Sequence, residues 1–297
     1  MITYRHHIVS LVSVFLALAV GVALGGGPLS ELGRTASATT ATAKEKTQDA
    51  TRAATFGDEF AVATGATLYA DRLQDHPVAV LALPGADERI VAALEQQVQA
   101  AGGTVPGRYD VQQALINPDE KSLVDTLGSQ LMTQLGAGVV DAEASTYTRM
   151  GQLIGVAIST TQPTAEPVGK DATSIRQSLV GADLMTSPRG EVDVAPLVLV
   201  VMASKPGANE DQAVLSGLLS GLATRTAGTV VVADSQAGFD GSLAALRREP
   251  VADEVTTVDG VESSLGQVTA TLALLRALAG NGGSFGASGA DGAVPLG

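Results

Sequence analysis

Residues that could carry out chemistry are scarce in this chain of 297 residues. It has no Cys and three His, and only His76 lies beyond the first seven residues. Without Cys there can be no disulfides, thiolate metal sites or cysteine nucleophiles. His76 stands beside a predicted domain boundary, which favours a surface position over a role as a general base.

The carboxylates form no catalytic pattern either. Asp234 follows a predicted strand and Glu88 begins a predicted helix, and such positions are typical of helix caps. The sequence offers neither of them a partner that would make it a general acid or base. The glycine motifs GxGxxG and GxxxxGK[ST] are also absent. We therefore expect a protein that is not an enzyme and that has no cofactor.

Copper ligands would be His, Met or Cys in clusters. The methionines beyond the first residue are scattered, and each lies within an apolar pattern, which predicts core packing: Met132, Met150, Met185 and Met202. His6 and His7 are adjacent and would point about 100° apart on a helix. The residues thus give no recognisable copper site.

The N-terminal segment has the pattern of a membrane helix. Residues 8–24 carry no charge and, with the glycines that follow, are long enough to cross a bilayer. Arg5 precedes them, so the positive-inside rule predicts a cytoplasmic N-terminus and an extracytoplasmic main domain. Residues 1–27 are predicted to be an uncleaved anchor. A cleaved signal peptide, with a site near residues 23–25, is the alternative.

Small residues recur every four positions in this segment, at Ala17, Gly21 and Gly25. Such a stripe lets two transmembrane helices approach closely, which predicts a homodimer face. The alternative is that Ala and Gly are simply frequent here.

Residues 28–76 predict a helical stalk or linker before the main domain. An apolar stripe at helical spacing indicates a weak coiled coil: Leu32, Ala53, Phe56, Phe60, Ala63, Leu68 and Leu73. The Thr- and Ser-rich residues 35–42 are poor helix formers and could be linker. Residues 75–77, with Pro77, are expected to end the helix.

Residues 77–280 alternate between buried strands and helices, which predicts an α/β domain with a mostly parallel sheet flanked by helices. Short apolar runs predict strands at 78–83, 197–203 and 229–233, with an edge strand at 255–258, and a further strand is expected to begin near Val105. Helical spacing predicts helices at 87–101, 119–135, 143–159, 171–184, 209–226 and 261–279. The Gly-rich residues 281–297 are predicted to be a disordered tail.

An internal echo links two of the expected strand-to-helix turns. Residues 84–88, PGADE, reappear as residues 206–210, PGANE. Duplication of a βαβ half would explain this, as would the general preference of such turns for Pro, Gly and a capping Asp or Asn. An anion or a protein partner could bind at these loops, which contain Gly85, Asp87, Gly207 and Asn209.

The formal net charge of −13 argues against a nucleic-acid binder, because such a protein needs a basic face. Hydrophobic residues make up 45% of the chain, enough for a close-packed core. No other apolar run is long enough to cross a bilayer, which excludes a polytopic helical transporter.

Three blocks of sequence stand out in order along the chain. They are residues 5–10 with 14–21, residues 101–108 with 117–118, and residues 258–262 with 266–268 and the ending 283–286. Together they resemble the actinobacterial MctB family over nearly the whole chain. The final block of that family usually carries His and Tyr, where this sequence has Ser284 and Phe285.

The resemblance implies a role in copper transport that keeps intracellular copper low, at the outer cell envelope. A second strand of the family, the SteB-like proteins, implies a scaffold at the division septum. Such a scaffold pairs with the membrane protein SteA and influences cell-wall hydrolysis. An anchor, a stalk and a non-catalytic α/β head fit this binding role better than they fit a pore.

Overall fold

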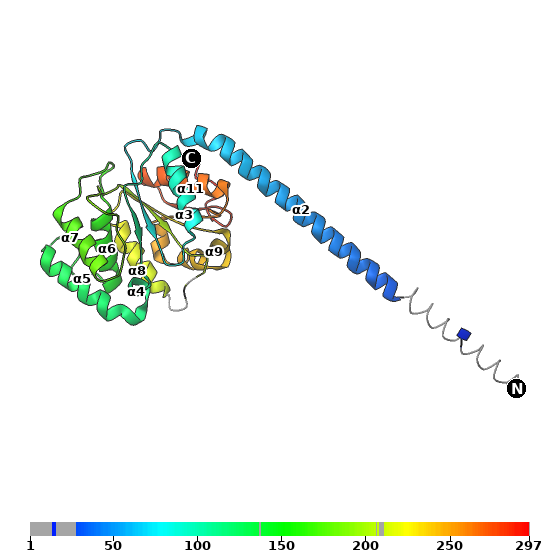
Figure 1. The fold of residues 1–297 in the computed structure, drawn as a ribbon, viewed down its shortest axis with the longest axis horizontal. Helices are drawn as coiled ribbons and strands as arrows, with labels where there is room; N and C mark the ends of the chain where they lie inside the picture. Colours follow the sequence, from blue (N-terminus) through cyan, green and yellow to red (C-terminus); the bar gives the residue numbers. More distant parts are fainter. Residues whose placement is uncertain (1–13, 16–27, 137, 206, 208–210, 297) are drawn as a thin grey trace. The chain divides into compact units, whose positions relative to one another are not determined.

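The computed structural model describes residues 14–15, 28–136, 138–205, 207 and 211–296, and only the backbone of residues 28–45. The chain divides into two compact units, Met1–Gly57 and Asp58–Gly297. The second unit holds the whole α/β domain (Figure 1).

A six-stranded sheet forms the centre of this domain, and every neighbouring pair of its strands is parallel. The order is β2-β1-β3-β4-β5-β6. The strands are β1 (Val78–Ala82), β2 (Arg108–Asp110), β3 (Leu197–Val201), β4 (Gly228–Ala233), β5 (Thr256–Asp259) and β6 (Gly283–Phe285). The strands predicted at 78–83, 197–203 and 229–233 are confirmed as β1, β3 and β4. Their continuous runs of Val, Leu and Ala are typical of strands in a sheet that is covered on both faces.

Helices cover both faces of the sheet. The longer helices of the domain are α3 (Glu88–Ala100), α5 (Lys121–Leu135), α6 (Thr146–Ile158), α7 (Lys170–Gly181), α8 (Gln212–Ala223) and α11 (Ser264–Leu278). The shorter ones are α4 (Gln113–Ile116), η1 (Pro118–Glu120), α9 (Ser235–Asp240), α10 (Ser242–Leu246) and η2 (Pro250–Asp253). In Figure 1, α3 and α11 lie on one side of the domain and α5 to α8 on the other.

Two hydrophobic cores result, one on each face of the sheet. Successive β3 residues alternate between them: Val198 and Val200 belong to the core under α6, α7 and α8, whereas Leu199 belongs to the core under α3 and α11. This alternation follows from the two-residue period of a strand. The sequence period therefore fixes which side chains meet which helix layer.

Glycines allow α6 and α8 to pack backbone against backbone. A Cβ built on Gly221 would lie 2.0 Å from the Thr148 carbonyl oxygen, and one on Gly151 would lie 2.0 Å from the Leu218 carbonyl oxygen. Both helices carry glycines four residues apart, with Gly155 and Gly217 completing the pairs. No side chain larger than hydrogen fits at these two contacts, so the close crossing depends on glycine.

The predicted stalk is helical but its details differ from expectation. Helix α2 spans Pro28–Tyr69, so it includes residues 35–42 and ends before the predicted break at 75–77. In the second unit its buried face is Ala61, Gly65 and Tyr69, and Gly65 packs against Val268 of α11. The predicted stripe does not supply this face, since Phe60 is 58% exposed.

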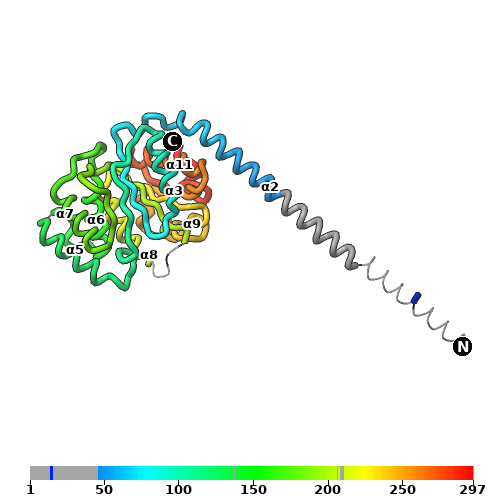
Figure 2. Tube along the Cα trace, in the orientation of Figure 1, coloured from blue at the N-terminus to red at the C-terminus, as the bar shows by residue number. Residues whose placement is uncertain are grey.

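The prediction of a disordered tail from residue 281 is wrong for the segment that forms β6. Gly283–Phe285 pairs in parallel with β5, and Phe285 is buried. Figure 2 shows the red C-terminal segment lying against the domain. As a consequence, β5 is not the edge strand that was expected. Composition alone misjudged the tail because one buried aromatic side chain anchors it.

The predicted anchor and its small-residue face lie almost wholly outside the described residues, Ala17, Gly21 and Gly25 included. Val14 and Phe15 are described, and both are helical and exposed. Among the described residues, no helix is both long and apolar enough to cross a membrane.

Candidate functional site

The strand order sets where a parallel α/β sheet has its crevice. From β1 the chain continues to β2, which lies on one side of β1 in the sheet. It then returns to β3 on the other side of β1 and continues away from β1 to β4. The chain thus reverses direction across the sheet between β1 and β3, and ligands of open α/β sheets bind outside the carboxyl ends of the strands at such a point. The loops that leave β1 and β3 are those that contain the predicted site residues.

The structure brings these two loops together. Gly85 has φ +82°, in the left-handed region, and a Cβ there would lie 3.1 Å from the Ala203 Cβ at the end of β3. Gly207 lies in the exposed loop after β3. Asn209 lies outside the described residues. The close approach explains why glycine follows Pro84 in this turn.

Asp87 caps helix α3. Its Oδ1 accepts a hydrogen bond of 2.8 Å from the Arg89 backbone N–H, and its Oδ2 lies 2.7 Å from Arg89 Nη2. These bonds lower the pKa of Asp87 to about 2, the Arg89 side-chain bond contributing most. The protein's own carboxylate thus occupies the place where an anion was expected, and anion binding here stays a prediction.

The helices that follow the two similar turns are capped at different positions relative to the repeat. The first gives its cap at Asp87, three residues after Pro84, whereas α8 is capped by Asp211, whose Oδ1 accepts from the Ala213 N–H at 2.8 Å. Asp211 lies beyond the repeated residues 206–210. The similarity of the two loops is therefore one of composition more than of capping.

Glu88 is engaged in an ion pair instead of acting as a cap. Arg108 of β2 donates to both of its oxygens at 2.7 Å and to Asp110 Oδ1 at 2.8 Å. The bond from Arg108 lowers the pKa of Glu88. Thr186 Oγ1 donates to the other oxygen of Asp110 at 3.0 Å. The cluster ties α3, β2 and the loop after α7 together, and it leaves Glu88 ionised, which is unsuited to a general acid.

The carboxyl ends of β4 and β5 hold a second set of polar groups. Asp234 caps α9 by accepting from the Ala237 N–H at 2.8 Å, as predicted for a cap, and it also accepts from the Ser204 hydroxyl. The Ser235 hydroxyl donates to Glu262. Through these bonds, the carboxylates of Asp234 and Glu262 hold the loops after β3, β4 and β5 in place.

The buried ion pair at the end of β5 was not predicted. Asp259 is fully buried, and its Oδ1 accepts from Arg247 Nη2 at 3.1 Å. Ser288 donates to Asp259 Oδ2 through its backbone N–H at 3.0 Å and its hydroxyl at 2.9 Å. A Cβ at Gly286 would lie 2.3 Å from Asp259 Oδ1. The residue blocks 258–262 and 283–286, distant in sequence, therefore meet here.

Residues 282–286 also spell G-x-S-x-G, the serine motif of hydrolases, in the segment that was expected to be disordered. In hydrolases this serine sits on a sharp turn between a strand and a helix. Here Ser284 lies in β6 and its hydroxyl accepts from Thr257 Oγ1 at 3.1 Å. Ser284 therefore lies within a strand and not on the strand-to-helix turn that positions the serine in hydrolases.

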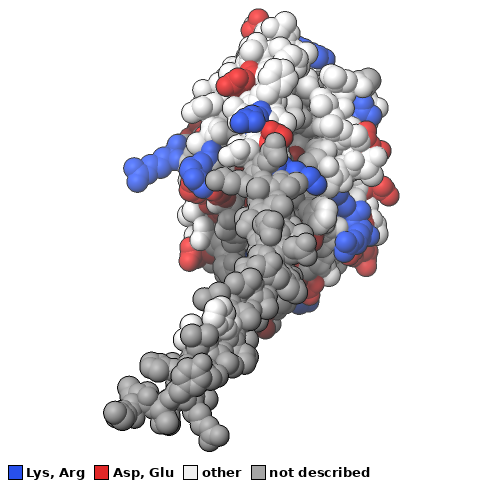
Figure 3. Space-filling model, turned by 90° about the vertical axis from the view of Figure 1, so that its right-hand side faces the viewer, with Lys and Arg blue, Asp and Glu red and all other residues white. Residues whose placement is uncertain are grey.

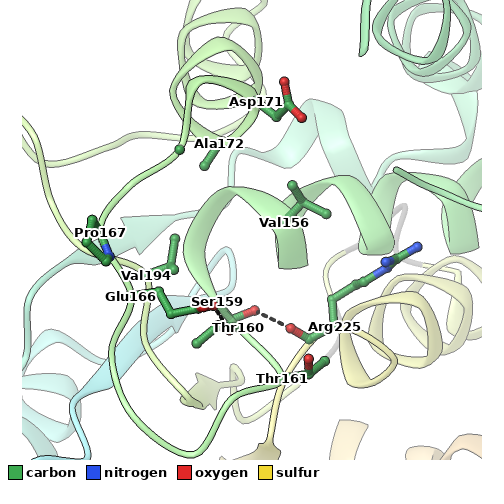
Figure 4. Close-up of a pocket in the computed structure, with 11 residues that line it drawn as sticks. Val156, Ser159, Thr160, Thr161, Glu166, Pro167, Asp171, Ala172, Val194 and Arg225 are labelled. Atoms are coloured by element: carbon green, nitrogen blue, oxygen red, sulfur yellow. Dashed lines mark hydrogen bonds between the residues drawn. The ribbon is translucent and has the colours of Figure 1, made fainter. Parts of the chain in front are cut away.

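Figure 4 shows a pocket of about 410 Å³ near the amino ends of β3 and β4, away from the predicted loops. The Ser159 hydroxyl donates to the Arg225 carbonyl oxygen at 3.2 Å, and the Thr160 hydroxyl donates to Glu166. Arg225 Nε is buried and has no hydrogen-bond partner among the described residues. Two carboxylates, those of Glu166 and Asp171, line the pocket together with this one cation, and this excess of negative charge disfavours an anionic ligand.

The possible copper ligands lie in the core. Met150, Met185 and Met202 are buried within one hydrophobic cluster, as predicted, and Met132 packs against it. His76 is half-buried, and its Nδ1 lies 2.6 Å from the Pro163 carbonyl oxygen, to which it must donate. Within the described ranges, no group of three or more His, Cys, Asp or Glu side chains could hold a metal ion.

Charge is distributed without a single dominant sign on the face seen in Figure 3, where basic and acidic side chains are interspersed among uncharged ones. The structure thus defines an α/β domain, which we call the head. At the carboxyl ends of its strands, the carboxylates of Asp87, Glu88, Asp234 and Asp259 form helix caps or ion pairs.

Comparison with known proteins identifies the family. Residues 1–295 match the family described as "Copper transport outer membrane protein, MctB", and the chain belongs to it. "Copper transporter MctB" of Mycobacterium tuberculosis (strain ATCC 25618 / H37Rv) is 30% identical over 96% of this chain and 95% of its own length. The protein of the same name from Mycobacterium leprae (strain TN) is 25% identical over 94% of both chains. The resemblance predicted from three sequence blocks is thus confirmed.

Proposed function

We propose that this protein serves in copper homeostasis at the cell envelope and helps to keep intracellular copper low. The observation that carries the proposal is the family match over residues 1–295, which includes the N-terminal segment as well as the head. Copper is the cargo in this proposal and not a resident cofactor. The relatives that are named copper transporters span nearly the full length of this chain.

The anchor belongs to the same proposal. Residues 8–24 are uncharged and follow Arg5, a pattern that supports a single membrane-spanning segment with the head outside the cytoplasm. Pairing of two chains through Ala17, Gly21 and Gly25 would give a homodimer. Replacing Gly21 with Leu should then weaken dimerisation of the full chain in detergent, measured by analytical ultracentrifugation.

The third part of the proposal is that the α/β head is not an enzyme. Asp87, Glu88, Asp234 and Asp259 are each held by a capping bond or an ion pair. Each of these bonds ties the carboxylate to its own loop or to a neighbouring element, which supports a structural role over that of a general base. We infer that the head binds and positions other molecules.

The test is cellular copper. Deletion of the gene should raise the copper content per cell, measured by mass spectrometry after growth in micromolar copper, and the full chain should restore it. A truncated chain that lacks residues 1–27 but keeps a cleavable signal should fail to restore it, because the anchor is missing. Unchanged copper on deletion would contradict the proposal.

A second candidate function is the SteB-like septal scaffold that pairs with a SteA-like membrane protein. The observation in its favour is Phe239 of α9, which is 79% exposed on the head. Aromatic side chains are enriched in protein–protein interfaces, which makes Phe239 the first residue to test. If the scaffold reading holds, Phe239→Ser should reduce co-purification with the SteA-like protein, whereas Leu296→Ser, at a residue 70% exposed, should not.

A further inference from the structure

A cavity of about 600 Å³ lies between helix α7 and the segment 187–191, apart from the loops and the pocket described above. Its size falls within the usual range for small-molecule sites. Val168, Val180 and Pro188 give it apolar walls, and Gln177 adds a polar group. One further lining residue, Arg176, is the reason to consider it as a binding site.

Arg176 is a buried cation, only 6% exposed. Its Nε donates to the Ala157 carbonyl oxygen at 2.6 Å and its Nη1 to the Val192 carbonyl oxygen at 2.7 Å. The guanidinium carbon also lies 5.5 Å from the centre of the Tyr109 ring. Backbone carbonyls and an aromatic face thus hold the guanidinium in one orientation, and neither supplies a negative charge.

The third guanidinium nitrogen of Arg176 differs from the other two. Arg176 Nη2 is buried and has no hydrogen-bond partner among the described residues. Arg176 takes part in none of the ion pairs formed by these residues, although the negative charge of Asp193 acts on it from a greater distance. A buried arginine is normally paired directly with an acid. A buried donor without an acceptor destabilises the fold unless something else satisfies it. Burial also lowers the pKa of Arg176, which remains a cation at neutral pH.

We propose that this cavity binds a small aliphatic monocarboxylate, whose carboxylate accepts from Arg176 Nη2 and whose hydrocarbon chain lies against Val168, Val180 and Pro188. The unpaired cation selects an anion. The apolar walls select a hydrocarbon body. Glu191 lines the same cavity and the charge of Asp193 acts on Arg176, so a ligand with a single negative charge fits better than a phosphate or another multiply charged anion.

Access to Nη2 requires a local movement, since the atom is covered from solvent. The segment 187–191 forms no helix or strand, and Gly190 within it has φ +87°. It is the wall of the cavity with the fewest backbone hydrogen bonds to give up. A carboxylate could therefore reach the guanidinium by displacing this segment and leaving α7 in place.

The experiment uses the purified full chain in detergent and two probes of equal size, butanoate and butanamide. Calorimetric titration should show saturable binding of butanoate at least tenfold tighter than that of butanamide. Val180→Glu places a competing carboxylate on the cavity wall and should weaken butanoate binding at least tenfold. Val180 is 46% exposed, so this variant should fold.

The matched control is Leu123→Glu on α5, at a residue 40% exposed that does not line the cavity, and it should bind butanoate as the parent does. Arg176→Gln should abolish the preference for butanoate over butanamide, and where that variant fails to fold the Val180 and Leu123 pair decides. Equal affinity for both probes, no binding of butanoate, or unchanged binding by Val180→Glu would each overturn the proposal.

Discussion

Asp259 and Arg247 form an ion pair in which the carboxylate has no exposure to solvent and the arginine side chain is 12% exposed. Such a pair is costly to bury, so its remaining hydrogen bonds decide whether it is tolerated. Here Arg247 also donates from Nε to Thr257 Oγ1 at 3.0 Å and from Nη2 to the Phe285 carbonyl oxygen at 2.8 Å. Breaking one partner would leave the other charge uncompensated.

Removing either side chain should therefore cost more than a typical surface substitution. We expect Arg247→Met to lower the free energy of unfolding by about 3–5 kcal/mol, because Asp259 would stay buried without its cation. Urea denaturation of the full chain in detergent measures this. Arg248→Met, at the exposed neighbouring residue, should change stability by less than about 0.5 kcal/mol, and equal effects of the two variants would contradict the buried-pair account.

Asp87 gives a prediction on pH. Its pKa lies near 2, below its ordinary value of 3.8, because Arg89 and the α3 backbone bind the ionised form. A lowered pKa in the folded state means that the cap stabilises the protein fully above about pH 4 and that this contribution is lost as the pH falls toward 2. In Arg89→Gln the pKa of Asp87 should rise toward 3.8, as followed by NMR titration of its side-chain carboxyl carbon. An unchanged pKa would contradict the assigned cause.

At the residue scale, what could be predicted was local. The caps Asp87 and Asp234 could be predicted because an Asp just before a helical pattern bonds to amides two or three residues ahead. Arg247, Asp259 and Ser288 could not, because their contacts join residues 12 to 41 positions apart. The same holds for the ion pair between Glu88 and Arg108.

At the scale of elements, α6 and α8 depend on glycine contacts. Gly221→Ala would place a methyl group on the Thr148 carbonyl oxygen, and the resulting overpacking should destabilise the protein by about 1–3 kcal/mol. Gly181→Ala on α7 is the matched control, because a Cβ there would meet no atom within 4 Å. That variant should be neutral or slightly stabilising, since Ala favours a helix over Gly. Thermal unfolding of both variants provides the measurement, and similar melting temperatures would rule out the close crossing.

Strand β6 lies in the Gly-rich segment that was predicted to be disordered from its composition, and substitutions there can test which description holds. Phe285→Ala should destabilise the protein by about 3–5 kcal/mol, as truncation of a buried Phe usually does, and should speed hydrogen exchange of the β5 amides. Leu296→Ala, at an exposed residue of the same tail, should have little effect. If residues 281–297 were disordered, neither substitution would matter.

The prediction of helices and strands succeeded where the hydrophobic pattern extended over five or more residues, and it was less successful for shorter elements. The apolar runs of β1, β3 and β4 and the helical spacing of α3 and α11 placed those elements within a few residues. β2, expected to begin near Val105, is found at Arg108–Asp110, whereas β6 has three residues, too few to show a period, and lies in the segment that was predicted to be disordered. The buried face of α2 was misassigned because small residues, Ala61 and Gly65, allow close packing that a hydrophobicity pattern does not register.

On the scale of the whole molecule, the parallel α/β class and the family were both predictable, since alternating strands and helices define the first and three ordered blocks the second. The grouping of charged side chains into caps and ion pairs at the carboxyl edge was not, because it depends on which loops the strand order brings together. That grouping is the observation behind our proposal that the head binds and positions other molecules.

The measurement that tests this account most directly is the copper content of cells that lack the gene, complemented with the full chain or with nothing. The account predicts raised copper in the uncomplemented cells and a return to the parental level with the full chain. The Glu88→Gln variant should restore copper as well as the parent chain does, because in our proposal Glu88 serves only to fix Arg108. Parental copper in cells without the gene would contradict the account.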